Sequence, residues 1–381
     1  MTLYLYLVVL FFNLVIAFRQ KSSKLLTMVT LLAILLLICG AGPNYVGQND
    51  YINYKIRYDN IQNVGLFDNI QVGYTLLMKA GNAFGLDFFW FRVLITAICL
   101  LLIYKKVIRK YGFSSNYVLA VYMIYPMIID SEHFRNFIAM TLFLLAVKYL
   151  EDSSLSGNIK FVMMVLLAAS VHTAFIFYLP FVFVHSEDKN KLVKWIAIAT
   201  GILTVVAILN DNNVPFVRLI IDVLDDQKAI SYLSRRTNLG YLVPVILHSM
   251  SIVLLAWSRS IVSRKDSRAT DLSLQCKATE NLNTELDFVS LVFWLNIAGI
   301  MFFPLFIMSL TFYRLSRNLL ILNFTVYSII SSKLRAGSVY KFVFNFVVLL
   351  STVVWLIADL IVTTAPERVL IPFFTRNSFL N

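Results

Sequence analysis

Long apolar runs, separated by short polar or charged stretches, recur along almost the whole chain, from residue 1 to residue 376. Hydrophobic residues make up 59% of the sequence, charged residues only 14%, and the mean hydropathy is +0.76. A soluble domain cannot cover so much apolar surface with so few polar residues. Backbone polar groups inside a bilayer must be satisfied within their own segment, so the runs predict helices. We therefore predict an all-α, polytopic integral membrane protein.

The apolar runs predict about 11–12 membrane segments, because a span needs about 20 residues and shorter runs are tolerated inside a bundle. The number depends on whether the run around His172 crosses once or is broken into two halves. No polar stretch is long enough to form an independent soluble domain. Residues 1–381 are therefore predicted to form a single membrane domain, with extracytoplasmic loops at 43–86 and 210–240. The first run, at 3–18, lacks a basic leader and a cleavage site, so we expect it to be retained as a helix.

Basic clusters between the spans predict the orientation of the chain. The positive-inside rule places the clusters at 19–24 and 105–110 in the cytoplasm. These juxtamembrane clusters account for the formal net charge of +12, so nucleic-acid binding is not predicted. The basic loop at 259–268 stays cytoplasmic only if the chain turns back near His172. We therefore predict a re-entrant or broken helix at that residue.

Arginines at the mouths of apolar segments are the main functional signal, because charge at membrane depth is costly unless it serves a polar cavity. Arg135, Arg314 and Arg317 hold such positions and are all predicted on the extracytoplasmic side. The planar guanidinium grips phosphate through paired hydrogen bonds, so these residues predict a pyrophosphate site. Two structural alternatives remain open. Arg135 can pair with Asp130 or Glu132 in its turn, and the other two can be interfacial residues that reach for the headgroups.

Transfer of a group to a hydroxyl also needs an acceptor for the proton. His172 is one candidate, because its ordinary pKa lies near neutrality, and Asp50 and Glu132 are the others. The structural alternative for His172 is a helix-breaking residue bonded to a neighbouring carbonyl. The sequence contains no Walker loop, zinc-protease motif, paired-cysteine site or G-x-S-x-G elbow, so neither a metal nor another cofactor is predicted.

The first outer loop has a helical pattern of its own. Its aromatic and apolar residues recur at spacings of three and four, with polar residues between them: Tyr51, Tyr54, Tyr58 and Ile61. This predicts an amphipathic helix at the membrane surface. The polar stretch at 212–237 is predicted to form a second outer cap.

Short motifs in a characteristic order point to a known family. They are GQNDYINY at 47–54, VGY at 72–74, FRNFIA at 134–139, AASVHTA at 168–174 and FYRLSR at 312–317. Together they resemble the EpsG-type branch of the Wzy polysaccharide polymerases over most of the chain. Members of that family often carry Glu before the Gly-Tyr pair, where this chain has Gln71 and Val72, and this argues against an acid/base role for the loop. They often carry Gln after the arginine, where Asn136 retains the amide.

The resemblance implies a glycosyltransferase that polymerises undecaprenyl-pyrophosphate-linked oligosaccharide repeat units. It implies a location in the bacterial cytoplasmic membrane, an active site on the extracytoplasmic face, and capsule, O-antigen or exopolysaccharide as product. The reaction is expected to be metal-independent, without a cofactor, and inverting. The implied partners are the lipid-linked donor and acceptor, membrane lipids, and the chain-length regulator and flippase of the same pathway.

With this resemblance, site roles can be assigned along the sequence. The predicted catalytic residues are His172, Arg135 and Arg314. The predicted substrate-binding residues are Arg317, Asp50, Tyr51, Tyr54, Tyr74, Glu132 and Tyr313. The aromatic residues of the outer loops are expected to stack on sugar faces, although aromatic belts are also ordinary at membrane interfaces.

A transporter or flippase of the same lipid-linked glycan is the main alternative, because a cationic cavity between helices serves transport as well. The sequence has no matching halves, and its site arginines are predicted toward one face, which favours the enzyme. A scaffold without catalytic activity is the third possibility.

Overall fold

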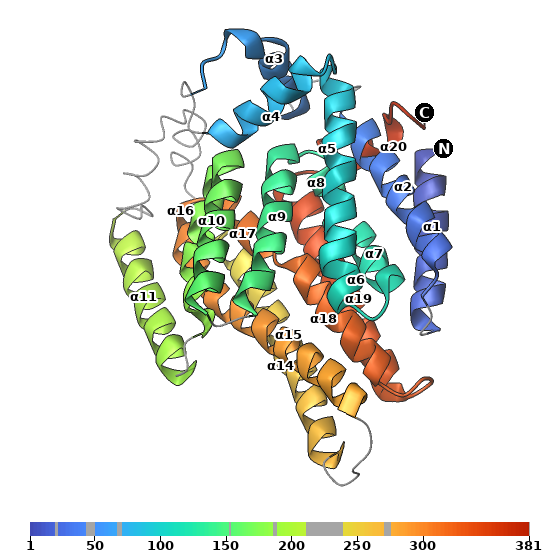
Figure 1. The fold of residues 1–381 in the computed structure, drawn as a ribbon, viewed down its shortest axis with the longest axis vertical. Coiled ribbons are helices and arrows are strands. Elements are labelled where there is room, and N and C mark those ends of the chain that lie inside the picture. The colour runs from blue at the N-terminus through green and yellow to red at the C-terminus, as the bar shows by residue number, and fades with distance from the viewer. Residues whose placement is uncertain are drawn as a thin grey trace. The chain divides into compact units, whose positions relative to one another are not determined.

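The computed structural model describes residues 1–19, 22–42, 50–66, 71–151, 154–185, 189–210, 239–269 and 276–380. These residues form helices joined by turns and short connections, and no strand occurs among them (Figure 1). The predicted all-α class is therefore confirmed. The predicted outer cap at 212–237 and the first residues of the GQNDYINY motif, at 47–49, lie outside the described residues.

The chain divides into two compact units. The first contains Met1–Lys148, Met163–Phe175 and Phe324–Asn381, and the second contains Tyr149–Val162 and Ile176–Asn323. The elements of the first unit are α1 (Thr2–Phe18), α2 (Lys24–Gly40), α3 (Asp50–Asp59), η1 (Ile61–Asn63), α4 (Val72–Ala83), α5 (Phe88–Ile103), the π-helix η2 (Tyr104–Ile108), α6 (Arg109–Tyr111), α7 (Ser115–Ile124), α8 (Met127–Asp130), α9 (Phe134–Ala146), α19 (Val339–Leu356), the π-helix η7 (Ile357–Thr363) and α20 (Leu370–Thr375). Those of the second unit are α11 (Lys189–Leu209), α14 (Leu242–Ala269), α15 (Cys276–Ala298), η5 (Gly299–Phe302), α16 (Phe303–Met308), η6 (Leu310–Tyr313) and α17 (Arg314–Arg317). Residues of both units occur in η3 (Val147–Leu150), α10 (Leu155–Val171), the 3-10 helix η4 (Thr173–His185) and α18 (Leu320–Lys333).

Several helices are long and apolar enough to cross a membrane. In the described part of the chain, four meet both conditions: Lys191–Leu209, Leu242–Ser263, Glu285–Met308 and Val339–Thr363. A fifth candidate is the pair Val72–Ala83 and Phe88–Tyr111, which is bent by 117°. Five shorter apolar helices of 10–17 residues accompany them. The membrane class is thus confirmed, whereas the larger number of crossings stays a prediction.

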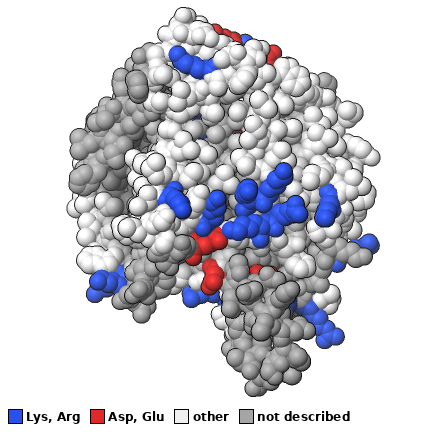
Figure 2. Space-filling view, in the orientation of Figure 1, with Lys and Arg blue, Asp and Glu red and all other residues white. Residues whose placement is uncertain are grey.

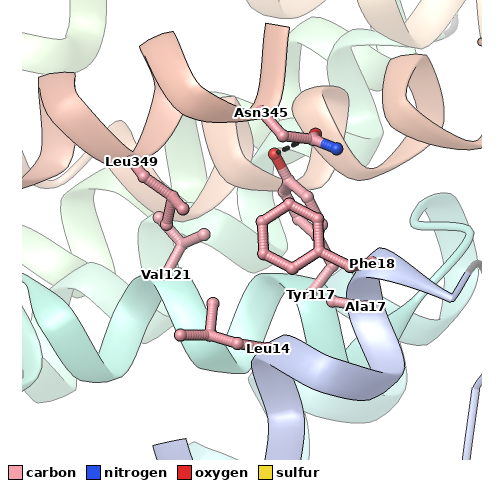
Figure 3. A pocket seen from close by; sticks show the side chains of 7 residues that line it. All are labelled: Leu14, Ala17, Phe18, Tyr117, Val121, Asn345 and Leu349. Carbon is pink, nitrogen blue, oxygen red and sulfur yellow. Dashed lines mark hydrogen bonds between the residues drawn. The ribbon is translucent and has the colours of Figure 1, made fainter. Parts of the chain in front are cut away.

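Polar side chains join the helices at one end of the first unit, which we call the Asn116 end. Asn116 donates a hydrogen bond to Asn13 (2.8 Å) and accepts one from the backbone of Ser23 (2.8 Å). Tyr117 donates to Asn345 on α19 (3.2 Å), beside a small and mostly apolar hollow between α1, α7 and α19 (Figure 3). The turn between α1 and α2, predicted to be cytoplasmic, therefore lies at this end.

The basic cluster at 105–110 falls on η2 and α6, just before the start of α7. It supplies Lys105, Lys106, Arg109 and Lys110. Figure 2 shows Lys and Arg side chains gathered in the lower half of this face, where α6 lies in Figure 1. The cluster is continuous in the chain with the Asn116 end, as the predicted orientation requires.

The opposite end of the first unit, which we call the Arg92 end, is held by hydrogen bonds to backbone carbonyls. Helix α2 has 17 residues, so its two ends lie about 25 Å apart at 1.5 Å per residue. Near its C-terminal end, Asn377 donates to the carbonyls of Leu36 (3.3 Å) and Leu37 (3.2 Å), and both chain termini lie beside α2 in Figure 1. The predicted extracytoplasmic segments of this unit gather here.

The second unit is fastened by buried polar groups as well. Helices α14 and α15 pack along each other (Figure 1). Between them, the buried His248 lies 2.8 Å from the carbonyl of Asn296. The side chain of Asn296 in turn donates to Asn323 (2.8 Å), so these polar groups are satisfied within the bundle. His248 thus has a structural partner.

Candidate functional site

The first outer loop forms the amphipathic helix that the spacing predicted. Helix α3 covers Asp50–Asp59, and Lys55 pairs with Asp59 (2.5 Å) on its exposed face. All four predicted apolar positions are buried: Tyr51, Tyr54, Tyr58 and Ile61. The buried face packs on aromatic residues of α4 and α5, with Tyr54 6.0 Å from Tyr74 between ring centroids. The helix therefore covers the Arg92 end of the first unit.

Arg135 lies in the first turn of α9, directly below this aromatic layer. The centre of its guanidinium lies 5.0 Å from the ring centroid of Tyr54 and 5.9 Å from that of Tyr74. One terminal nitrogen donates to the side-chain oxygen of Gln71, and the buried Nε has no hydrogen-bond partner in the described structure. An arginine stacked on aromatic rings, with donors still available, is suited to bind an anion.

No carboxylate neutralises Arg135 at ion-pair distance in the part of the chain that the structure describes. The structural alternative, in which Arg135 pairs with Asp130 or Glu132, is therefore wrong. Asp130 instead accepts a hydrogen bond from Tyr122 (3.1 Å). Gln71, the residue in place of the family's frequent acid, contacts Arg135 as a neutral amide. The charge of Asp50 acts on Arg135 from beyond ion-pair distance, so the direct contacts of the guanidinium are with neutral groups.

The tyrosines of this layer are buried inside the unit. Tyr74 has no exposed surface, and Tyr51 and Tyr54 are 8% and 7% exposed. A sugar ring cannot stack on Tyr74 in this arrangement, so the sequence-based role for that residue does not fit its burial. The rings of Tyr54 and Tyr74 support Arg135 instead.

Arg92 is a second buried arginine at the same end, on α5, and it is 2% exposed. Its terminal nitrogens donate to backbone carbonyls of four residues: Ile38, Cys39, Ala41 and Ser131. Its guanidinium centre also lies 5.2 Å from the ring centroid of Tyr51. Arg92 thus ties together the end of α2, the turn after α8 and helix α3. The terminal donors of Arg92 are engaged by backbone carbonyls, whereas Arg135 donates to the side chain of Gln71.

Glu132 lies in the turn between α8 and α9, next to the carbonyl that Arg92 holds, and it is 9% exposed. Burial raises the pKa of Glu132 to about 7; the nearby Arg92 lowers this pKa and Asp50 raises it. Asp50 lies in the first turn of α3 and accepts a long hydrogen bond from Tyr54 (3.5 Å). A carboxyl group that titrates near neutral pH is well matched to general-base catalysis. Of the candidate bases, Glu132 therefore has the most suitable environment.

The raised pKa of Glu132 predicts a loss of stability as the pH rises. An unfolded carboxyl titrates near 4.5 and this one near 7, so the folded state holds more protons between those values. The free energy of unfolding should fall across this window by about 3 kcal/mol. Glu132→Gln should remove that fall: the variant should match the wild type near pH 4.5 and melt higher at pH 8. Melting curves in detergent at several pH values measure this difference.

Glu367→Gln provides the control, because Glu367 is exposed and should leave the pH dependence of melting unchanged. Wild-type and Glu132→Gln curves that run parallel from pH 4.5 to 8 would contradict the assignment.

His172 marks a break between two helices, as predicted. Helix α10 ends at Val171 and the 3-10 helix η4 begins at Thr173. The backbone N–H of Ala174 donates to Nδ1 of His172 (3.3 Å), so the bond goes to an amide rather than to a carbonyl. A neutral imidazole whose Nδ1 accepts a hydrogen bond carries its proton on Nε2. In this state Nδ1 is an occupied acceptor, and a role of His172 in catalysis stays a prediction.

Helix α10 also contains more residues before the break than the sequence pattern indicated. It starts at Leu155 and has 17 residues, so His172 lies about 25 Å along it at 1.5 Å per residue. That rise approaches the thickness of a bilayer core, which is about 30 Å. A helix of this length that starts at one membrane surface ends near the other. A reversal of the chain there stays a prediction.

Gly73 brings His172 to the same end of the first unit as Arg135. A Cβ built on Gly73 would lie 2.2 Å from the hydroxyl oxygen of Ser170 and 3.2 Å from its Cβ. Helix α4, which carries Tyr74, therefore crosses the last turn of α10 in close contact. The position after the Val72 of the VGY motif must lack a side chain for this packing.

Gly73→Ala is expected to destabilise the protein by about 1–3 kcal/mol, because the added methyl group overpacks the crossing of α4 and α10. Ser170→Ala removes the closest clashing atom, so the double variant should recover much of the lost melting temperature. Gly201→Ala is the matched control, since no atom lies within 4 Å of a Cβ built there. Equal melting temperatures for the two glycine variants would contradict the close crossing.

The second pair of predicted arginines belongs to the second unit. Arg314 is half-buried and donates through Nε to the carbonyl of Thr311 (2.9 Å). Arg317 is 1% exposed, donates to the hydroxyl of Tyr313 (3.1 Å), and has its guanidinium centre 5.5 Å from that ring's centroid. Its burial rules out the alternative in which Arg317 reaches for the headgroups. The predicted meeting of these arginines with Arg135 stays a prediction.

The short turn that carries Arg314 and Arg317 is anchored by η4. The hydroxyl of Tyr178 donates to the carbonyl of Leu315 (2.6 Å), and the rings of Phe177 and Phe312 meet edge to face at 5.6 Å. Among the described residues, no group of three or more His, Cys, Asp or Glu side chains comes together to hold a metal ion.

A sequence model of the EpsG family matches residues 27–374. The chain belongs to the EpsG family. The resemblance read from the short motifs is thus confirmed, and family membership fits a role in polysaccharide polymerisation by a membrane protein. No curated protein and no solved structure matches the chain.

In this EpsG protein, sequence reasoning found Arg135 but missed two of the residues around it. Arg92 was read as part of an apolar span, although a charge inside such a run is itself a signal of function or of a buried partner. Gln71 indicated only that the loop lacks an acid/base group, whereas the side-chain oxygen of Gln71 accepts a hydrogen bond from Arg135. The pattern of residues showed which side chains were unusual but not what they touch.

Proposed function

We propose that this EpsG protein polymerises oligosaccharide repeat units carried on undecaprenyl pyrophosphate, in the cytoplasmic membrane and on its extracytoplasmic face. The observation that carries the proposal is the environment of Arg135. It is a cation on two tyrosine rings, it donates to a neutral amide, and its buried Nε has no hydrogen-bond partner among the described residues. A fixed cation of this kind stabilises charge that develops on a leaving diphosphate. The position of the Arg92 end, opposite the basic cytoplasmic cluster, supports the assigned face.

In the proposed reaction, a hydroxyl oxygen of the acceptor repeat unit attacks the anomeric carbon of the donor glycan. The bond between that carbon and the diphosphate oxygen breaks, and undecaprenyl pyrophosphate leaves with the electron pair. Arg135 binds the diphosphate, and the Nε2–H of His172 donates a hydrogen bond to it. The carboxylate of Glu132 takes the hydroxyl proton, which suits a carboxyl group whose pKa lies near 7. A single displacement of this kind inverts the anomeric centre.

Arg314 and Arg317 are proposed to bind substrate in the same reaction, with Tyr313 holding Arg317 in place. A double-mutant cycle tests this role. If Arg135 and Arg317 act on one diphosphate, the loss of rate in the double variant should differ from the sum of the two single losses. Additive losses would contradict a shared ligand.

The proposed activity can be measured directly. Purified protein in detergent or vesicles is incubated with lipid-linked repeat units, and the products are separated by length. A ladder of longer glycans, lost in Arg135→Gln, is expected. Movement of the lipid-linked unit across vesicles without a ladder would favour the transporter, and neither activity would favour the scaffold.

A further inference from the structure

A large apolar groove lies within the second unit, apart from its arginine cluster. It is lined by η4, α11 and the junction of α15 with η5, it opens to the outside, and its cavity volume is about 410 Å³. Phe183 and Trp195 line it from η4 and α11, and among the described residues Lys191 is the charged side chain that lines it. This volume falls within the range of ordinary ligand sites. The groove therefore has the composition of a site for a molecule with a long apolar part and an anionic end.

Helix α11 packs against α16 and η5 but leaves most of its apolar residues uncovered. It is one of the candidate membrane spans, yet only 6% of the residues in its apolar stretch are buried in the protein. The apolar residues of α11 must be covered by lipid on most sides. The groove between η4 and α11 is space that hydrocarbon must fill, since an empty gap forfeits dispersion contacts.

The dimensions of the groove match one leaflet. Its lining on α11 runs from Lys191 to Ala199, which is about 12 Å at 1.5 Å per residue. Half of a bilayer core is about 15 Å thick. Lys191 lies at one limit of this stretch, in the first turns of α11, on the side that the positive-inside rule assigns to the cytoplasm.

We propose that this groove binds an anionic phospholipid of the cytoplasmic leaflet, with one acyl chain along α11 and its phosphate at Lys191. The charge at the groove and its single-leaflet length both favour this occupant. The polyprenyl carrier is the less suitable occupant, because its diphosphate is proposed to bind on the extracytoplasmic side, whereas the charged end of the groove is on the other side. The inference does not depend on the polymerase activity.

The test uses the full-length protein, delipidated in mild detergent and titrated with phosphatidylglycerol, phosphatidylcholine, undecaprenyl phosphate or inorganic phosphate, with melting temperature as the readout. Phosphatidylglycerol should stabilise the wild type more than phosphatidylcholine, and inorganic phosphate should have no effect. Lys191→Met should reduce the preference for phosphatidylglycerol about fivefold, which corresponds to about 1 kcal/mol for one lysine near anionic lipid. Ala199→Trp should fill the groove and abolish the stabilisation by either phospholipid.

Matched controls lie on the same helix. Lys194 and Ala197 are exposed on α11 but do not line the groove, so Lys194→Met and Ala197→Trp should respond to lipid as the wild type does. The proposal is overturned if Ala199→Trp and Ala197→Trp respond equally, if Lys191→Met keeps the full preference, or if undecaprenyl phosphate stabilises the protein more than phosphatidylglycerol does.

Discussion

Replacement of Arg135 by lysine is expected to lower kcat for glycan polymerisation by about 100- to 1,000-fold, the range seen when one preorganised donor to a developing charge is lost. Lysine keeps the positive charge but has no planar fork, so it cannot stack on Tyr54 and Tyr74 while it holds a diphosphate through paired hydrogen bonds. The initial rate of ladder formation at saturating lipid-linked substrate measures the effect. A larger change in kcat than in KM would identify an interaction that strengthens in the transition state.

Arg109→Lys is the control for this experiment. Arg109 is exposed and lies in the basic cluster beyond the Asn116 end, so its replacement should leave the rate within about twofold, as expected for a surface change. Both variants should be compared by melting temperature, so that a folding defect is recognised. If Arg135→Lys keeps more than a third of the wild-type kcat, Arg135 does not stabilise the leaving group.

The contrast between Arg135 and Arg92 shows where sequence reasoning succeeds and where it stops. The periodicity of α3 was predictable because helical spacing is local, and the break at His172 was predictable from the charge pattern of distant loops. The role of Arg92 was not predictable from the sequence. The carbonyls that accept its hydrogen bonds, at and just after the end of α2, lie 51–54 residues away in the chain. Likewise, the hydrogen bond from the backbone of Ala174 to His172 is a local geometry that no residue pattern encodes.

Arg314 and Arg317 show a second limit of prediction from the sequence. Their residue type and position predicted function, and the burial of Arg317 on Tyr313 agrees with a polar site rather than a surface role. Convergence with Arg135 is a matter of tertiary arrangement, which neither spacing nor composition determines. For that reason the double-mutant cycle, rather than further reading of the sequence, decides whether one ligand is shared.

Arg92→Met is expected to cause the largest loss of stability of any single change considered for this protein, at least about 4 kcal/mol. Each backbone carbonyl left buried without a donor costs about 1–3 kcal/mol, and Arg92 serves four of them. Arg92→Lys should recover part of the loss, because an ammonium group has three donors. Melting temperature in detergent measures the series, with the exposed Arg335→Met as a control that should melt like the wild type.

Arg92 should also act on catalysis through Glu132, and this effect separates it from a residue that only stabilises the fold. Arg92 lowers the pKa of Glu132, so Arg92→Met should raise that pKa further above 7. If Glu132 is the base, the rising limb of the pH profile of kcat/KM must then move to higher pH in the variant, measured at a temperature where it stays folded. In Glu132→Gln that limb should be absent. A variant that melts early but keeps the wild-type pH profile would limit Arg92 to a structural role and remove Glu132 as the proton acceptor.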